Sequence, residues 1–304
     1  MKCIRDFIVN FERKNVELLI DKQLEFVYDL ACQTGTMGDD IHIYSPWDGS
    51  EPKGFIIDIH GGGLIAGTAL QNESFCRWIA NSGYKVFSID YPLIPEVTFL
   101  EQVESIIKAI KKISKSESDW NKIGKSKFLF GDSAGALLAL VTLGLTSPKE
   151  QVRKDFGIAA ECVEWDGIWL QSPMIYTTQC DAIGLIMSKI YYGKGWKKQP
   201  WAKYIKDPIW YLVHDYPDVV LFSSSFKDDL MNHTSKAIME MCEFRDLAPK
   251  CFCTDNPEHD ANVLFPWEED SEKVNESAID FLEKYFKEKM LGKSKKITND
   301  AYAL

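Results

Sequence analysis

Short apolar runs alternate with helical patterns along most of this chain, and this alternation limits the possible folds more than any other feature. The runs are rich in β-branched and aromatic residues and lie at 55–59, 85–89, 127–130, 167–170, 219–222 and 250–253. Near-continuous hydrophobicity predicts strands buried on both faces, as in a parallel sheet covered by helices. Amphipathic stretches predict helices at 70–81, 97–114, 134–145, 233–244 and 274–289. The order predicts a doubly wound α/β fold.

Two segments do not follow this alternation. Residues 1–38 look helical and precede the sheet, although residues 42–44 already indicate an earlier strand at its antiparallel end. Residues 175–213 are rich in Trp and Tyr and are too long for a simple connection. We interpret the two segments together as a lid over a site. Residues 291–304 carry no core pattern and are expected to be frayed, so residues 1–304 are expected to form a single domain with a lid.

Composition and charge exclude several classes of function. The formal net charge is −10 and the pI is about 5.1, which argues against nucleic-acid binding and against stable association with anionic membranes. No run of 18 uncharged apolar residues is present, and charges interrupt the amino terminus before a signal-peptide core could form, so we expect a cytoplasmic protein. The eight cysteines show no CxxC spacing, and no histidine accompanies Asp90, so no metal site is expected.

The sequence Gly131-Asp-Ser-Ala-Gly135 stands between a predicted strand and a predicted helix. This is the context of a nucleophile elbow, a tight turn that projects a serine hydroxyl from the edge of a sheet. Small flanking residues are needed because the inner side of the turn has no room for side chains. We therefore predict that Ser133 is a nucleophile. The alternative interpretation is an ordinary glycine-rich turn.

The sequence His60-Gly-Gly-Gly63 follows another buried run. Acyl transfer needs backbone N–H groups directed at the developing oxyanion, and glycine lets a loop approach a substrate closely. The expected donors are the N–H groups of Gly61, Gly62 and Ala134. His60 is expected to brace this loop by hydrogen bonding.

The two motifs and a third, Tyr91-Pro-Leu-Ile-Pro-Glu96, resemble those of the hormone-sensitive-lipase-like branch of the α/β-hydrolases, the family of bacterial carboxylesterases. The resemblance extends from about residue 41 to residue 288 and is poor in the two lid segments. It implies an α/β-hydrolase fold with an eight-stranded sheet, a helical cap and no cofactor. It also implies activity on esters with short or medium acyl chains.

An acid and a base follow Ser133 in the order typical of this fold. Asp228 comes shortly after the predicted strand 219–222, where a carboxylate can orient an imidazole. Asp229 competes for this role, and we favour Asp228. His259 lies in a loop directly after the last predicted strand, where a general base could reach Ser133. For an isolated loop histidine, a solvated surface role would be the simpler interpretation.

Several apolar residues near these motifs are candidates for contact with a substrate. They are Leu64, Met174 and Tyr176. The aromatic cluster at 191–210 either lines a pocket or anchors the lid to the core, and the sequence does not separate these roles.

The combined interpretation is a serine hydrolase that cleaves small carboxylic esters through an acyl-enzyme. An amidase or arylformamidase would use the same groups, and a non-catalytic α/β-hydrolase that binds a small molecule is the alternative from another class. The expected partner is a small-molecule ester. The sequence allows a homodimer through the exposed edge of the last strand but does not require one.

Overall fold

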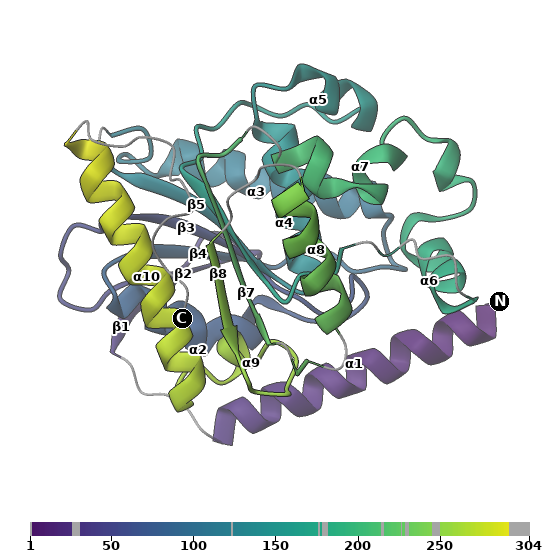
Figure 1. The fold of residues 1–304 in the computed structure, drawn as a ribbon, viewed down its shortest axis with the longest axis horizontal. Coiled ribbons are helices and arrows are strands. Elements are labelled where there is room, and N and C mark those ends of the chain that lie inside the picture. The colour runs from purple at the N-terminus through teal and green to yellow at the C-terminus, as the bar shows by residue number, and fades with distance from the viewer. Residues whose placement is uncertain are drawn as a thin grey trace.

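An eight-stranded sheet forms the centre of the molecule (Figure 1). The computed structural model describes residues 2–25, 31–122, 124–175, 177, 182–213, 216–225, 227–228, 231–244 and 250–291. The strands are β1 (Cys32–Thr36), β2 (Ile41–Pro46), β3 (Gly54–Ile59), β4 (Lys85–Ile89), β5 (Ser126–Asp132), β6 (Gly167–Gln171), β7 (Val219–Ser225) and β8 (Lys250–Thr254).

The strand order is β1-β2-β4-β3-β5-β6-β7-β8. The β1–β2 and β2–β4 pairs are antiparallel, and every later pair is parallel. The six strands expected from the apolar runs and the strand expected at 42–44 are all present, so the mostly parallel α/β sheet is confirmed. Because β3, β5, β6, β7 and β8 are parallel, the loops that follow them all lie at one edge of the sheet.

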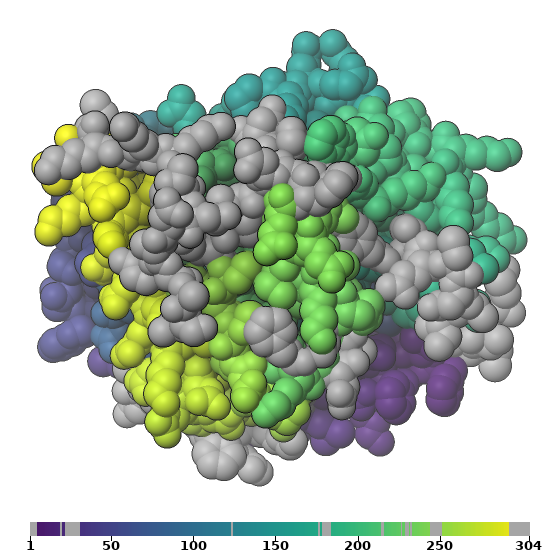
Figure 2. Space-filling view, viewed as in Figure 1, coloured from purple at the N-terminus to yellow at the C-terminus, as the bar shows by residue number. Residues whose placement is uncertain are grey.

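Helices cover both faces of the sheet, as continuous hydrophobicity in the strands requires. One face packs against α2 (Glu73–Asn81) and α10 (Glu269–Met290), and the other against α3 (Phe99–Ser116), α4 (Ala134–Thr146) and α8 (Asn232–Phe244). In Figure 1, α10 in yellow and α8 in green lie on either side of β7 and β8, and Figure 2 shows atoms of both helices on this face of the molecule.

Within β5 the two faces alternate residue by residue. Phe128 and Phe130 belong to the core beneath α2 and α10, and Leu129 belongs to the core beneath α3 and α4. This period of two is the geometry of a strand, and it explains why β5 needs apolar residues at consecutive positions. The strand is therefore held from both sides just before Ser133.

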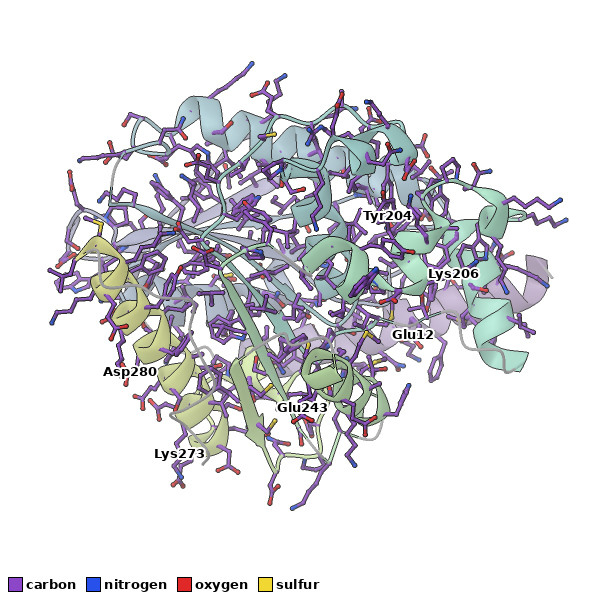
Figure 3. All side chains as sticks on the ribbon, turned by 45° about the horizontal axis from the view of Figure 1, so that its top comes forward. Glu12, Tyr204, Lys206, Glu243, Lys273 and Asp280 are labelled. Atoms are coloured by element: carbon purple, nitrogen blue, oxygen red, sulfur yellow. The ribbon has the colours of Figure 1, made fainter. Side chains whose placement is uncertain are left out.

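The distribution of polar residues in each helix matches how much of that helix is buried. Every residue of α4 is buried, which explains why its sequence, AGALLALVTLGLT, contains no charge. By contrast α10 is amphipathic, and Lys273 and Asp280 project from its outer side in Figure 3. Among the described residues, no helix is both long and apolar enough to cross a bilayer.

The two segments outside the alternation differ in structure from each other. In the first, α1 (Lys2–Glu25) is helical, but residues 32–36 form β1 at the sheet edge, so the helical pattern expected over 1–38 ends earlier than predicted. In the second, short helices follow one another. They are α6 (Ala182–Tyr192), η2 (Trp196–Lys198), α7 (Ala202–Lys206) and η3 (Ile209–Val213).

Three further short helices complete the structure. They are η1 (Ala69–Asn72), which opens the helix expected at 70–81, α5 (Glu150–Phe156) and α9 (Ala261–Leu264). The last two were not expected, because four to seven residues are too few to show a helical period.

Candidate active site

Ser133 lies at the sharp turn between β5 and α4. Its backbone angles are φ 48° and ψ −115°, a conformation that L residues rarely adopt and that the surrounding packing must hold. The Ser133 N–H donates to the Gln171 carbonyl of the neighbouring strand at 2.9 Å. A Cβ on Gly135 would lie 1.8 Å from the Ile59 carbonyl oxygen. The small residues of this motif are therefore required by close backbone packing.

His259 connects Ser133 to Asp228. The Nε2 atom of His259 lies 2.9 Å from Ser133 Oγ, and its Nδ1 atom lies 2.7 Å from Asp228 Oδ2. Asp228 is fully buried, and its other oxygen accepts the Met231 N–H at 2.9 Å. The three residues, which are far apart in sequence, are thus brought together in a continuous hydrogen-bonded chain. Asp229, the competing acid, lies outside the described residues.

A second carboxylate contacts the same histidine. Asp260 Oδ2 lies 3.0 Å from His259 Nε2, and the Asp260 side chain is 5% exposed. Burial lowers the pKa of the His259 imidazole, but Asp260 and Asp228 outweigh this effect and raise its pKa to about 10. Sequence analysis did not single out Asp260. The sequence does show an acidic residue directly after the candidate base. It does not reveal the left-handed backbone conformation of Asp260, in which its side chain contacts Nε2.

The glycine loop after β3 lies beside Ser133. A Cβ on Gly61 would lie 3.2 Å from the Ser133 Cβ, so glycine is needed for this approach. However, the Gly61 N–H donates to Asp132 Oδ2 at 3.0 Å, so it is not available to an oxyanion. The expectation for Gly61 is corrected accordingly. Gly62, Gly63 and Ala134 have N–H groups that donate to no acceptor among the described residues.

Contacts among buried polar groups hold the glycine loop in place. The His60 Nδ1–H donates to the Gly61 carbonyl at 2.8 Å, and the His60 ring stacks on Tyr91 with centroids 4.2 Å apart. The Tyr91 hydroxyl in turn donates to the His60 carbonyl at 2.8 Å. Burial lowers the pKa of His60 to about 4, which keeps the ring neutral. His60 therefore braces the loop, as its position suggested.

The residues expected to contact a substrate have different surroundings. Leu64 is fully buried in the core, so in this structure it supports the glycine loop and has no surface to offer a substrate. Met174 is also buried, and its N–H donates to the Ser133 carbonyl at 2.9 Å. Tyr176 lies outside the described residues.

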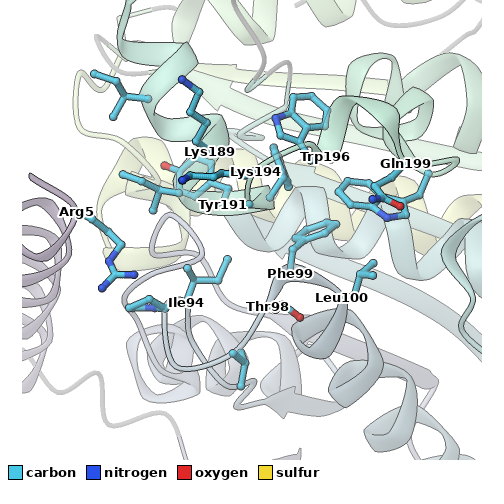
Figure 4. Close-up of a pocket in the computed structure, with 17 residues that line it drawn as sticks. Arg5, Ile94, Thr98, Phe99, Leu100, Lys189, Tyr191, Lys194, Trp196 and Gln199 are labelled. Carbon is cyan, nitrogen blue, oxygen red and sulfur yellow. The ribbon is translucent and has the colours of Figure 1, made fainter. Parts of the chain in front are cut away.

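A cavity of about 750 Å³ lies between α1, the 94–100 segment and α6 (Figure 4). Its walls are mainly aromatic and aliphatic. Tyr191 is one of the lining residues, and its hydroxyl lies 4.0 Å from the position of a Cβ on Gly63. Arg5, Lys189 and Lys194 also line it. The aromatic cluster of the second segment thus both lines a cavity and packs on the core, since Trp196 and Trp201 are buried.

The remaining histidines serve other contacts. The expectation that no histidine accompanies Asp90 is wrong, because His42 Nε2 lies 3.2 Å from Asp90 Oδ2. His233 Nε2 lies 3.2 Å from the Thr234 hydroxyl. His214 is outside the described residues. Within the part of the chain that the structure describes, no cluster of three or more His, Cys, Asp or Glu side chains could hold a metal ion.

Comparisons with known proteins agree with this architecture. A family model described as alpha/beta hydrolase fold matches residues 56–241. Hormone-sensitive lipase of Mus musculus is 33% identical over 116 residues, which is 38% of this chain but only 15% of that protein.

Two solved structures illustrate the likeness in fold. Esterase B from Lactobacillus rhamnosis superposes with a TM-score of 0.77 at 18% identity, over 97% of this chain and 100% of that chain. A hyperthermophilic esterase from the archaeon Pyrobaculum calidifontis superposes with a TM-score of 0.62 at 20% identity, over 92% of this chain and 93% of that chain. At these identities the superpositions establish a common fold.

Proposed function

Because this chain belongs to the α/β-hydrolase fold family, whose model matches more than half of it, we propose that it is a serine hydrolase that cleaves small carboxylic esters. The observation that carries the proposal is the chain of contacts from Ser133 Oγ to His259 Nε2 at 2.9 Å and from His259 Nδ1 to Asp228 at 2.7 Å. This is the arrangement by which a base removes a serine proton while a carboxylate fixes the imidazole tautomer.

The reaction follows from these positions. Ser133 attacks the ester carbonyl while His259 takes its proton, and Asp228 stabilises the imidazolium that forms. Gly62, Gly63 and Ala134 donate their N–H groups to the oxyanion, with Gly63 replacing Gly61 because the Gly61 N–H is bound to Asp132. His259 then protonates the departing alcohol. Water attacks the acyl-enzyme in a second cycle of the same steps and releases the acid.

The substrate is proposed to be an ester with a short or medium acyl chain. The cavity bordered by Tyr191 is mostly apolar, and its volume of about 750 Å³ is in the range of small-molecule sites. The names of the two similar structures, both esterases, support the same class of reaction. Arg5 of α1 and residues between 186 and 201 border this cavity, and we assign α1 and residues 182–213 the role of a lid.

Replacement of the nucleophile tests the proposal. Ser133→Ala should lower kcat for hydrolysis of p-nitrophenyl butyrate by about 10⁴-fold or more, because it removes the attacking oxygen. Ser114→Ala, which removes an exposed hydroxyl on α3, is the matched control and should keep wild-type turnover. Circular dichroism should show both variants folded. Undiminished hydrolysis by folded Ser133→Ala would exclude Ser133 as the nucleophile.

A further inference from the structure

Asp260 occupies an unusual position for an acidic residue. Its side chain is buried, its Oδ2 atom lies 3.0 Å from His259 Nε2, and its Oδ1 atom has no hydrogen-bond partner among the described residues. Its backbone is left-handed, with φ 57° and ψ 24°. The Asp260 carbonyl accepts the N–H groups of Val263 and Leu264 at 2.9 and 3.0 Å, which holds this conformation.

Two groups with opposite requirements therefore compete for one ring nitrogen, since the Ser133 hydroxyl must donate to it and the Asp260 carboxylate accepts a proton from it. His259 Nε2 lies 2.9 Å from Ser133 Oγ and 3.0 Å from Asp260 Oδ2. A base must present an unprotonated nitrogen to the serine hydroxyl. A proton held between Nε2 and the Asp260 carboxylate blocks that step, whichever of the two atoms carries it.

We propose that Asp260 is a positioning residue that retains a proton on the His259–Asp260 pair and thereby confines turnover to alkaline pH. The proposal rests on the proposed hydrolase function, in which His259 is the base. Loss of the proton from the pair frees Nε2 to accept the Ser133 proton. During turnover, the imidazolium that forms is held by carboxylates on both nitrogens, Asp228 on Nδ1 and Asp260 on Nε2.

The other groups that face the pair reinforce this assignment. Burial is the largest cause that raises the pKa of Asp260, and the charge of Asp228, which approaches from the loop after β7, raises it further. At the end of β5, burial and then the Asp260 charge raise the pKa of Asp132. Ser172, after β6, acts in the opposite direction and lowers the pKa of Asp260, but less than burial and Asp228 raise it. The surroundings are thus acidic or neutral, and they favour a bound proton.

Titration of the histidine itself provides the test. In protein labelled with ¹³C at histidine Cε1, the His259 signal is assigned by its absence in His259→Asn. We expect this signal to titrate well above the ordinary imidazole range in wild type, and at least about one pH unit lower in Asp260→Asn. Asparagine tolerates the left-handed backbone, and Asp260→Gly is a second variant that suits it equally. Asp255→Asn is the matched control, because Asp255 lies in the same loop but is exposed and paired with Lys227.

In the pH profile of kcat/KM for p-nitrophenyl butyrate, the midpoint of the acid limb should shift together with the His259 titration midpoint. An unchanged His259 midpoint in both Asp260 variants, or a shift of equal size in Asp255→Asn, would overturn the proposal. The titration needs no turnover, so a wild-type protein that fails to hydrolyse the ester would refute the proposed function and leave the test of Asp260 intact.

Discussion

At the scale of single residues, a network of buried carboxylates lies beneath the candidate site. The Asn72 side-chain amide donates to Asp58 Oδ1 at 2.9 Å and to Asp132 Oδ1 at 2.7 Å, and so joins β3 to β5. Asp132 also accepts the Gly61 N–H. Because Asp58 and Asp132 are buried without a cationic partner in these contacts, the network favours neutral acids, and its protonation is linked to stability.

Asp58→Asn should remove one component of this pH dependence. Burial, the largest influence, raises the pKa of Asp58 to about 6, although Ser88, Asn72 and Cys76 donate hydrogen bonds to it. A raised carboxyl pKa stabilises the fold below the unfolded pKa of about 4, and that stability is lost as pH rises through about 6. The free energy of unfolding of wild type relative to Asp58→Asn should therefore fall by about 2 kcal/mol between pH 4 and pH 7.

Urea denaturation of the two proteins across this range provides the measurement. Asp119→Asn, an exchange in a surface turn outside the network, is the control and should show no such trend. A wild-type advantage that grows with pH would contradict the sign of this linkage.

The sequence predicts which side chains at the strand ends belong to the candidate site, but it does not predict where backbone N–H groups point. Ser133, Asp228 and His259 could be proposed because each follows a recognisable apolar run. The role of Gly61 could not, because its N–H is directed by Asp132, which is 71 residues away in sequence. The contact of Asp260 with His259 likewise depends on local backbone angles.

At the scale of elements, α1 is tied to the glycine loop through one side chain. Arg13 Nε donates to the Ile65 carbonyl at 2.9 Å, and its two terminal nitrogens reach the Glu96 carboxylate at 3.0 and 2.6 Å. On the same helix Val9 is buried in the core, and Ile8 packs against the core while partly exposed. A lid role for α1 would depend on this attachment, since Phe7, Phe11 and Leu18 are exposed and contribute little burial.

Arg13→Met should loosen α1. The variant keeps much of the aliphatic stem but loses the paired hydrogen bonds, which in a partly exposed position are worth about 1 kcal/mol. Amide hydrogen exchange in residues 2–25 should become about fivefold faster, and kcat/KM for p-nitrophenyl butyrate should change with it. Lys14→Met is the control, because Lys14 is an exposed neighbour of Arg13 on the same helix and does not line the cavity. Exchange in α1 that is equal in the two variants would contradict the anchoring role of Arg13.

At the scale of the whole molecule, the alternation of strands and helices could be read from the sequence because both faces of the sheet are covered. The six apolar runs lie within β3 to β8 and the strand expected at 42–44 lies within β2. The family indicated by the three motifs is confirmed by the family match. The strand β1 was missed, because its sequence, CQTGT, is polar and mostly exposed at the sheet edge. Polar edge strands carry no core pattern, so periodicity does not reveal them.

The most direct measurement of the central claim is covalent labelling of the nucleophile. An alkyl fluorophosphonate should react with one equivalent of protein, and peptide mass spectrometry should place the adduct on Ser133, with parallel loss of ester hydrolysis. His259→Asn, which removes the base 2.9 Å from Oγ, should slow labelling strongly. An adduct on another residue, or full hydrolysis by protein completely labelled at Ser133, would contradict the assignment of this site.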